Sequence, residues 1–148
     1  MFKRRHYKWN DGKELQLHDG TLIMGILNGT PDSFSDGGLY NSVDAAVQHV
    51  KDMIVDGADL IDLGVESTRP GFTPLTAEEE IERLESLLDP VLGASTVPVS
   101  IDTYHAKTAD YAFSKGAHIL NDIWGLHYDR DMADVAAKHR VPVIIMHN

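Results

Sequence analysis

The sequence predicts an α/β protein built around a parallel sheet. Five short segments are apolar at consecutive positions, which is typical of parallel strands that are covered on both faces. Segments with the periodicity of amphipathic helices separate them, so the predicted order is βαβαβαβαβ. The predicted strands span residues 22–27, 60–65, 97–101, 117–120 and 141–146.

Capping residues and glycines set the ends of the predicted helices. Ser42 can cap the first helix, and Gly57 follows it where a left-handed stop is expected. Thr76 and Glu79 have the spacing of a capping box at the start of the second helix. The third helix is expected to stop at Gly116. The four helices are expected over residues 42–54, 76–91, 104–115 and 129–139.

The segment before the first strand, residues 7–17, predicts a small hairpin around Asn10-Asp11-Gly12. Five strands suit an open doubly wound sheet, whereas a complete (β/α)8 barrel needs roughly 250 residues. The pattern alone is therefore compatible with a small open sheet and with an unfinished barrel.

Composition narrows the class of protein. A chain of 148 residues that is 43% hydrophobic can form one domain with its own core. Its 13 basic and 23 acidic residues give a formal net charge of −10, which argues against nucleic acid or a membrane surface as a partner. The absence of cysteine excludes disulfides and thiolate chemistry, and no apolar run has signal-peptide or membrane-spanning length. We expect a cytoplasmic protein.

Polar side chains gather at the carboxyl end of every predicted strand. Each of them alone is explained by a helix cap or a turn. Because the carboxyl ends of parallel strands share one face, the five groups together indicate a ligand site there. The groups are Asn28, residues 66–69, residues 102–103, residues 121–122 and residues 147–148.

Two long runs resemble the signatures of dihydropteroate synthases. Residues 24–38 are MGILNGTPDSFSDGG, and residues 57–71 are GADLIDLGVESTRPG. Three further segments resemble the next strands of that family, in the same order: residues 99–103, 119–122 and 145–147. The resemblance covers almost the whole chain after about residue 22.

Two positions depart from the family pattern. Gly29 stands where the family usually has Val, and Val65 stands where it usually has a second Gly. We expect Gly29 to loosen the entrance of the first loop and Val65 to crowd a backbone that approaches the ligand.

The resemblance implies a (β/α)8 TIM barrel, of which residues 1–148 would form the N-terminal part, with the first five parallel strands and their intervening helices. It implies the folate-pathway transferase reaction in which (7,8-dihydropterin-6-yl)methyl diphosphate and para-aminobenzoate condense to 7,8-dihydropteroate and diphosphate. The family's later strands carry further pterin and diphosphate ligands that this sequence lacks. The chain alone is therefore expected to be weak or inactive, and a homodimer is expected only with those strands.

The same resemblance assigns roles to individual residues. A carboxylate and an amide can recognise the edge of a pterin ring, and two apolar side chains would pack near that ring. The residues matched to pterin are Asp102, Asn121, Ile123 and Met146. Those matched to diphosphate are Asn28, Thr68 and Arg69, with Asn28 as the ligand of Mg2+. The aminobenzoate loops carry Thr30, Pro31, Phe34 and Pro70, and the catalytic set is Asn28, Thr68, Arg69, Asp102 and Asn121.

Two other functions remain compatible with the sequence. One is a non-catalytic remnant that binds pterin without turning it over. The other is a pterin- or folate-binding methyltransferase domain of related barrel type, which would also use an Asp and an Asn. The Thr-Pro-Asp-Ser-Phe-Ser-Asp and Ser-Thr-Arg-Pro-Gly runs argue against the methyltransferase, because such a domain should lack the aminobenzoate loops.

Overall fold

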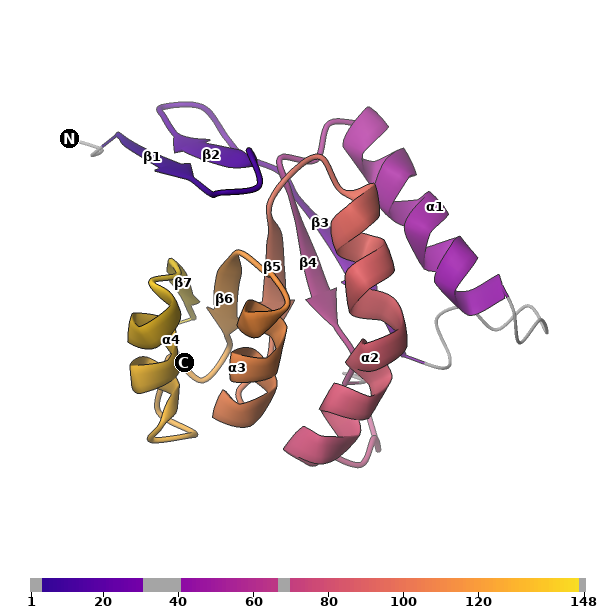
Figure 1. Cartoon of the computed structure of the whole chain (residues 1–148), viewed down its shortest axis with the longest axis vertical. Coiled ribbons are helices and arrows are strands. Elements are labelled where there is room, and N and C mark those ends of the chain that lie inside the picture. Colours follow the sequence, from indigo (N-terminus) through magenta and orange to yellow (C-terminus); the bar gives the residue numbers. More distant parts are fainter. Residues whose placement is uncertain (1–3, 31–40, 67–69, 147–148) are drawn as a thin grey trace.

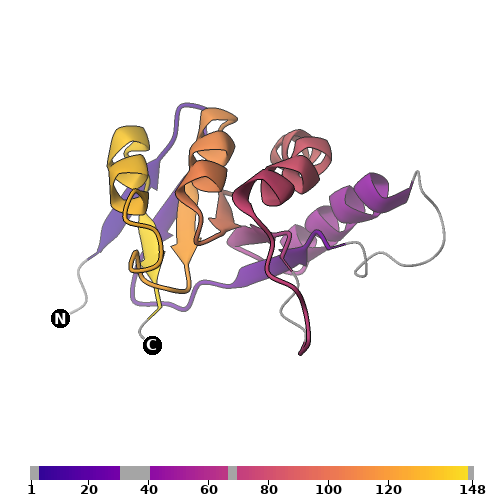
Figure 2. The same cartoon turned by 90° about the horizontal axis from the view of Figure 1, so that it is seen from below.

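The computed structural model describes residues 4–30, 41–66 and 70–146. Its main body is a five-stranded parallel sheet with four helices on one face (Figure 1, Figure 2). The strands are β3 (Met24–Asn28), β4 (Leu60–Gly64), β5 (Val99–Asp102), β6 (Ile119–Asp122) and β7 (Val143–Ile145). The helices are α1 (Asn41–Val55), α2 (Ala77–Ala94), α3 (Ala106–Ser114) and α4 (Met132–His139).

The strands lie side by side in chain order, β3-β4-β5-β6-β7, and each pair is parallel. All five predicted strands are present. Three of them extend through the polar residues that were expected to follow them, so β3 ends at Asn28, β5 at Asp102 and β6 at Asp122. The parallel ladder therefore holds these polar residues in fixed register, which a loop would not do.

Local signals set most helix ends as predicted. Thr76 is the N-cap of α2, where its Oγ1 accepts from the Glu79 N–H at 3.2 Å. Gly57 and Gly116 both have positive φ just beyond α1 and α3. The prediction for Ser42 is wrong, because α1 begins at Asn41 and Ser42 lies within its first turn.

The helix α4 begins at Met132, later than the predicted residue 129. The reason is that Asp129 has another role. Its Oδ2 accepts from the N–H of Ala106, the first residue of α3, at 2.8 Å, and its Oδ1 accepts from the Asp131 N–H at 3.0 Å. Asp129 thus satisfies a free N–H at the start of α3 and forms a turn ahead of α4.

The two faces of the sheet have different surroundings. The face toward the helices carries the main core, in which Leu27, Leu63 and Ile101 are almost fully buried. The opposite face is covered by no helix of the described residues (Figure 2). The prediction of two-sided burial therefore holds for β4, where every residue is buried, but is wrong for β3, where Ile26 is 50% exposed.

A hairpin packs at the amino ends of the strands, as Figure 1 shows. It consists of β1 (Arg5–Lys8) and β2 (Glu14–Leu17), and its turn contains Gly12 at a φ of 87°. Leu15 of the hairpin packs against Leu60 and Ile119. The predicted hairpin is confirmed, and it lies at the end of the sheet opposite the polar strand ends.

The buried His118 connects this hairpin to the sheet. Its Nδ1 accepts from the Val99 N–H at 3.0 Å, so Nε2 carries the proton and donates to Asp11 at 2.6 Å. Burial lowers the pKa of His118, which keeps the ring neutral and preserves the bond from Val99. This histidine therefore has a structural role.

The two departures from the family pattern face each other. A Cβ atom on Gly29 would lie 3.2 Å from Val65 Cγ1 and 2.6 Å from Leu87 Cδ1. Val65 is 1% exposed and belongs to the core between sheet and helices. The expectation that Val65 crowds a ligand-facing backbone is therefore wrong, because its side chain lies in the core, where it and Leu87 border the space that a side chain at position 29 would occupy.

This arrangement predicts strong coupling between the two positions. Gly29→Val alone should overpack the core and cost about 1–3 kcal/mol of unfolding free energy. Val65→Gly alone should leave a cavity and cost about 2–4 kcal/mol. The double variant should be more stable than the sum of these losses by about 1 kcal/mol or more, as measured by urea unfolding. Additive losses would show that the positions do not share one space.

Candidate functional site

Two of the predicted pterin residues, Asp102 and Asn121, lie in one row with Asn28, which was predicted to bind diphosphate, across the carboxyl ends of the strands. Asn28 is in register with Gly64, and Asp102 is in register with Asn121. A Cβ atom on Gly64 would lie 3.2 Å from Asp102 Oδ2, so the glycine leaves room for that carboxylate. Residues in parallel register share a face, which here is the face opposite the helices. Sequence and structure therefore agree on the placement of Asp102 beside Asn121.

A second row of polar groups lies beneath the first. Asp62 and Ser100 are in register two residues before Gly64 and Asp102, so they share the same face. The Ser100 hydroxyl donates to Asp62 Oδ1 at 2.5 Å, and Asn121 Nδ2 lies 3.3 Å from each Asp62 oxygen. Burial raises the pKa of Asp62, and these hydrogen bonds oppose that rise.

The sequence analysis does not predict Asp62 and Ser100, because both lie inside segments whose apolar residues predict only buried strands. The signal that points to them is the alternation of side chains along a strand. A polar residue two positions before a site residue faces the same side of the sheet. Asp62 precedes Gly64 by two, and Ser100 precedes Asp102 by two.

The Asp102 carboxyl group is in a strongly acidic environment. Burial, followed by repulsion from Asp62, Glu80, Glu66 and Asp122, raises its pKa from 3.8 to about 7. Within residues 4–30, 41–66 and 70–146, no hydrogen-bond donor contacts this carboxyl group. A ligand that donates hydrogen bonds or carries positive charge would satisfy it.

The raised pKa of Asp102 predicts a pH dependence of stability. The folded state binds the proton of the Asp102 carboxyl group more tightly than the unfolded chain does. The stability that this protonated carboxyl group contributes is therefore fully present below about pH 4. It is lost as the pH rises through about 7. Urea unfolding should therefore give a lower stability at pH 8 than at pH 5.5, and Asp102→Asn should reduce that difference. An equal pH dependence in both proteins would contradict the assignment.

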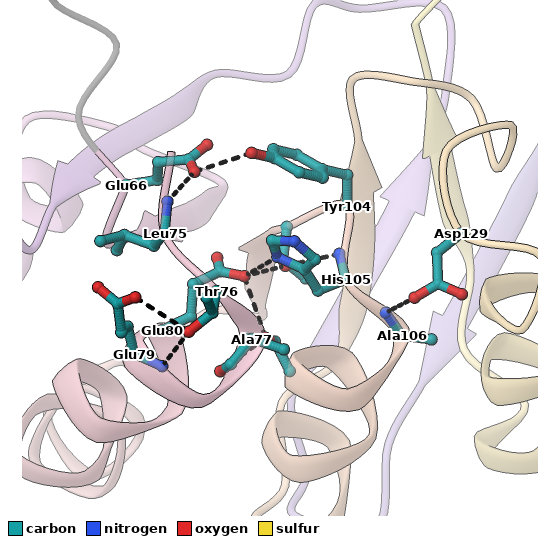
Figure 3. Close-up of polar contacts among 12 residues, drawn as sticks. Glu66, Leu75, Thr76, Ala77, Glu79, Glu80, Tyr104, His105, Ala106 and Asp129 are labelled. Atoms are coloured by element: carbon teal, nitrogen blue, oxygen red, sulfur yellow. Dashed lines mark hydrogen bonds and ion pairs between the residues drawn. The ribbon is translucent and has the colours of Figure 1, made fainter. Parts of the chain in front are cut away.

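A buried glutamate fixes the loop after β5, as Figure 3 shows. Glu80 of α2 is 2% exposed, and its Oε1 accepts from the hydroxyls of Thr103 and Thr108, each at 3.0 Å. The same oxygen lies 2.5 Å from Nδ1 of His105. Thr103 directly follows Asp102, the last residue of β5, and His105 lies two residues further along the chain. Glu80 thus ties the segment that follows Asp102 to the neighbouring helix.

A second glutamate connects three segments at the same end of the sheet (Figure 3). Glu66 Oε1 accepts from the Leu75 N–H at 2.9 Å and from the Tyr104 hydroxyl at 2.8 Å. Burial and the adjacent Glu66 raise the pKa of Tyr104, so its hydroxyl remains a donor at neutral pH. The chain after β4, the chain before α2 and the chain after β5 therefore meet at one carboxylate.

The loop after β6 is held by Asp122. This residue is fully buried, and its two carboxylate oxygens accept from the N–H groups of Trp124 at 2.9 Å and Leu126 at 3.0 Å. Leu126 has a positive φ of 71°, which the second bond stabilises. Asp122 therefore shapes the backbone around the half-buried Ile123.

The remaining predicted residues have varied positions. Asn28 and Pro70 are exposed, Thr30 is buried, and Met146 is 51% exposed just beyond β7. The half exposure of Met146 leaves its side chain available for a ligand. Four predicted residues lie outside the described residues: Pro31, Phe34, Thr68 and Arg69.

The described part of the chain contains no group of three His, Cys, Asp or Glu side chains that could hold a metal ion. Asn28 offers an exposed amide at the edge of the sheet. One amide oxygen is a reasonable donor for a hard cation that keeps several waters and binds phosphate oxygens. The described residues therefore fit such an ion only if a phosphate-bearing substrate supplies further oxygen ligands.

The fold is that of a barrel-type α/β protein, with a row of polar side chains at the carboxyl ends of its parallel strands. A family model described as pterin binding enzyme matches residues 24–148, and the chain belongs to this family. None of the described helices is long and apolar enough to cross a membrane.

Known proteins support this membership. The chain is 55% identical, over 136 residues, to a dihydropteroate synthase of Clostridium beijerinckii, covering 92% of this chain and 51% of that protein. A Xanthomonas albilineans dihydropteroate synthase solved with 4-aminobenzoic acid matches with a TM-score of 0.83 and 42% identity, over 93% of this chain and 50% of that one. A dihydropteroate synthase of Anaplasma phagocytophilum with bound 6-hydroxymethylpterin-monophosphate matches with a TM-score of 0.77 and 48% identity, over 86% and 49%.

These matches confirm the predicted fold class, the first five parallel strands of a (β/α)8 barrel with their helices. They also confirm the resemblance on which the expected function rests. The chain spans about half the length of the relatives that it matches.

Proposed function

We propose that the protein represented by this chain is a dihydropteroate synthase. In this proposal it condenses (7,8-dihydropterin-6-yl)methyl diphosphate with para-aminobenzoate to give 7,8-dihydropteroate and diphosphate. The observation that carries the proposal is the register pair of Asp102 and Asn121 on the open face of the sheet. The relatives and solved structures that match the chain are proteins of this name.

The pterin would bind against this pair. Asp102 has no described donor, and the reduced pterin ring offers N–H groups along one edge that could fill this role. Asn121 would add an amide at the next strand, and Ile123 and Met146 would pack near the ring. Planar recognition of this kind needs fixed acceptors, and the strand register fixes both residues.

The diphosphate would lie at the other end of the row, near Asn28, with Thr68 and Arg69 as its further ligands. Asn28 would also hold Mg2+, which when bound would neutralise charge on the diphosphate oxygens. Thr30, Pro31, Phe34 and Pro70 would line the aminobenzoate side.

The chemistry requires charge stabilisation more than a strong base. The bond between the methylene carbon and the diphosphate oxygen breaks, and the positive charge that develops spreads over the pterin. The neutral aryl amine then forms a carbon–nitrogen bond to the methylene and loses a proton. The acidic side chains around Asp102, namely Asp62, Glu66, Glu80 and Asp122, would favour that positive charge.

We further infer that residues 1–148 are the N-terminal part of a pterin-binding barrel, because the chain spans half of relatives that share its fold. A homodimer would involve the other half of such a barrel. Small-molecule substrates and a cytoplasmic location are consistent with a formal net charge of −10 and no cysteine.

A complementation assay tests this function. The chain would be mixed with the separately expressed C-terminal half of the 55% identical relative and supplied with both substrates and Mg2+. We expect 7,8-dihydropteroate and equimolar diphosphate from the mixture and little product from the chain alone. Pterin binding by a folded mixture without any product would instead favour a non-catalytic pterin-binding protein.

A further inference from the structure

The orientation of the Asn121 amide is set by the residue beneath it. Asn121 Nδ2 lies 3.3 Å from both oxygens of Asp62. An ionised carboxylate only accepts hydrogen bonds, so it can hold the NH2 end of an amide but not the carbonyl end. No donor in the described part of the chain contacts Asn121 Oδ1. The carbonyl oxygen of Asn121 is therefore the end left for a ligand.

Asp62 itself is held in place. It is 4% exposed in the middle of β4, and it is in register with Ser100, whose hydroxyl donates to its Oδ1. The central position in the sheet fixes its backbone on both sides, through β3 and β5. A buried carboxylate held by two side-chain donors leaves the amide above it little freedom to rotate.

We propose that Asp62 is a positioning residue that orients Asn121, so that the site presents two neighbouring acceptors, the Asp102 carboxylate and the Asn121 carbonyl oxygen. Such a pair selects a ring edge with two hydrogen-bond donors. If the proposed function is correct, on which this inference rests, the pterin 2-amino group and a ring N–H supply those donors. The pair should disfavour lumazine, which has a carbonyl oxygen in place of the 2-amino group.

The Asp62→Asn variant tests the proposal, because an amide at position 62 can donate to Asn121 Oδ1. The Asn121 side chain could then rotate and present its NH2 group to the ligand. The chain would be titrated with pterin and with lumazine by calorimetry. We expect the wild-type chain to prefer pterin, and the preference to fall about 10-fold in Asp62→Asn. The matched control Asp89→Asn makes the same substitution at an exposed position of α2 and should keep the preference within about twofold.

A second readout needs no ligand. Hydrogen exchange of the Asn121 side-chain amide, followed by NMR in the wild-type chain, should be slower than that of the exposed Asn28. An unprotected Asn121 amide would overturn the proposal even if Asp62→Asn failed to fold. An unchanged pterin preference in a folded Asp62→Asn variant would also overturn it. Failure of the folded wild-type chain to bind either ring, with a protected amide, would instead count against the proposed function.

Discussion

Glu80→Ala is expected to lower the free energy of unfolding by about 3–5 kcal/mol. The substitution leaves three donors, from Thr103, Thr108 and His105, without their shared buried acceptor. Burial of the ionised Glu80 side chain is itself unfavourable, and it raises the pKa of this residue. Removing the side chain therefore recovers part of the stability that is lost with its hydrogen bonds. A loss of this size is a large fraction of the stability of a small domain, roughly 5–15 kcal/mol.

Urea unfolding monitored by circular dichroism measures this effect. The matched control is Glu82→Ala, which removes an exposed glutamate from the same helix and should change stability by less than about 0.5 kcal/mol. Glu80→Gln should fall between the two, because its amide oxygen can still accept. If Glu80→Ala resembled the control, the connection between α2 and the segment after β5 would contribute nothing to stability.

Asp102→Asn is expected to weaken pterin binding by roughly 10- to 150-fold, which corresponds to about 1.5–3 kcal/mol. The substitution keeps the shape of the side chain but replaces one acceptor oxygen with an NH2 group. A ring N–H that faced the carboxylate would then face a donor. The effect follows only if Asp102 contacts the ring, since no described residue depends on this carboxyl group for a hydrogen bond.

Calorimetric titration with dihydropterin-methyl diphosphate, with and without Mg2+, measures this change. Asp89→Asn is a suitable control, because Asp89 is exposed on α2, away from the strand ends. Its affinity should match that of the wild type. Equal affinity for Asp102→Asn and the control would place the ligand elsewhere, and the assignment of Asp102 would be wrong.

The sequence predicted the order of the elements and the shared edge of Asp102 and Asn121, because both depend on local patterns. Apolar runs define strands, and parallel strands bring their carboxyl ends together. The same patterns misplaced the start of α4, since Asp129 bonds to Ala106 of a distant segment. No pattern of neighbouring residues reports such a contact.

The sequence did not predict the buried acidic residues that support the site. Asp62 and Glu80 are separated in the chain from the residues that they hold, Asn121 and Thr103, and only the fold brings them together. The proximity of Gly29 to Val65 depends on the fold in the same way, so the sequence could not predict that the two departures from the family pattern are neighbours. Packing and electrostatics between distant segments are the part that sequence reasoning could not reach.

Mapping the pterin site by NMR tests the central claim most directly. The isotope-labelled chain would be titrated with 7,8-dihydropterin while backbone amide shifts are followed. We predict the largest changes at residues 102–103 and 121–123, with little change in the hairpin of β1 and β2 at the opposite end of the sheet. A folded chain whose shifts change mainly at the hairpin, or not at all at saturating pterin, would contradict the claim that these strand ends form a pterin site.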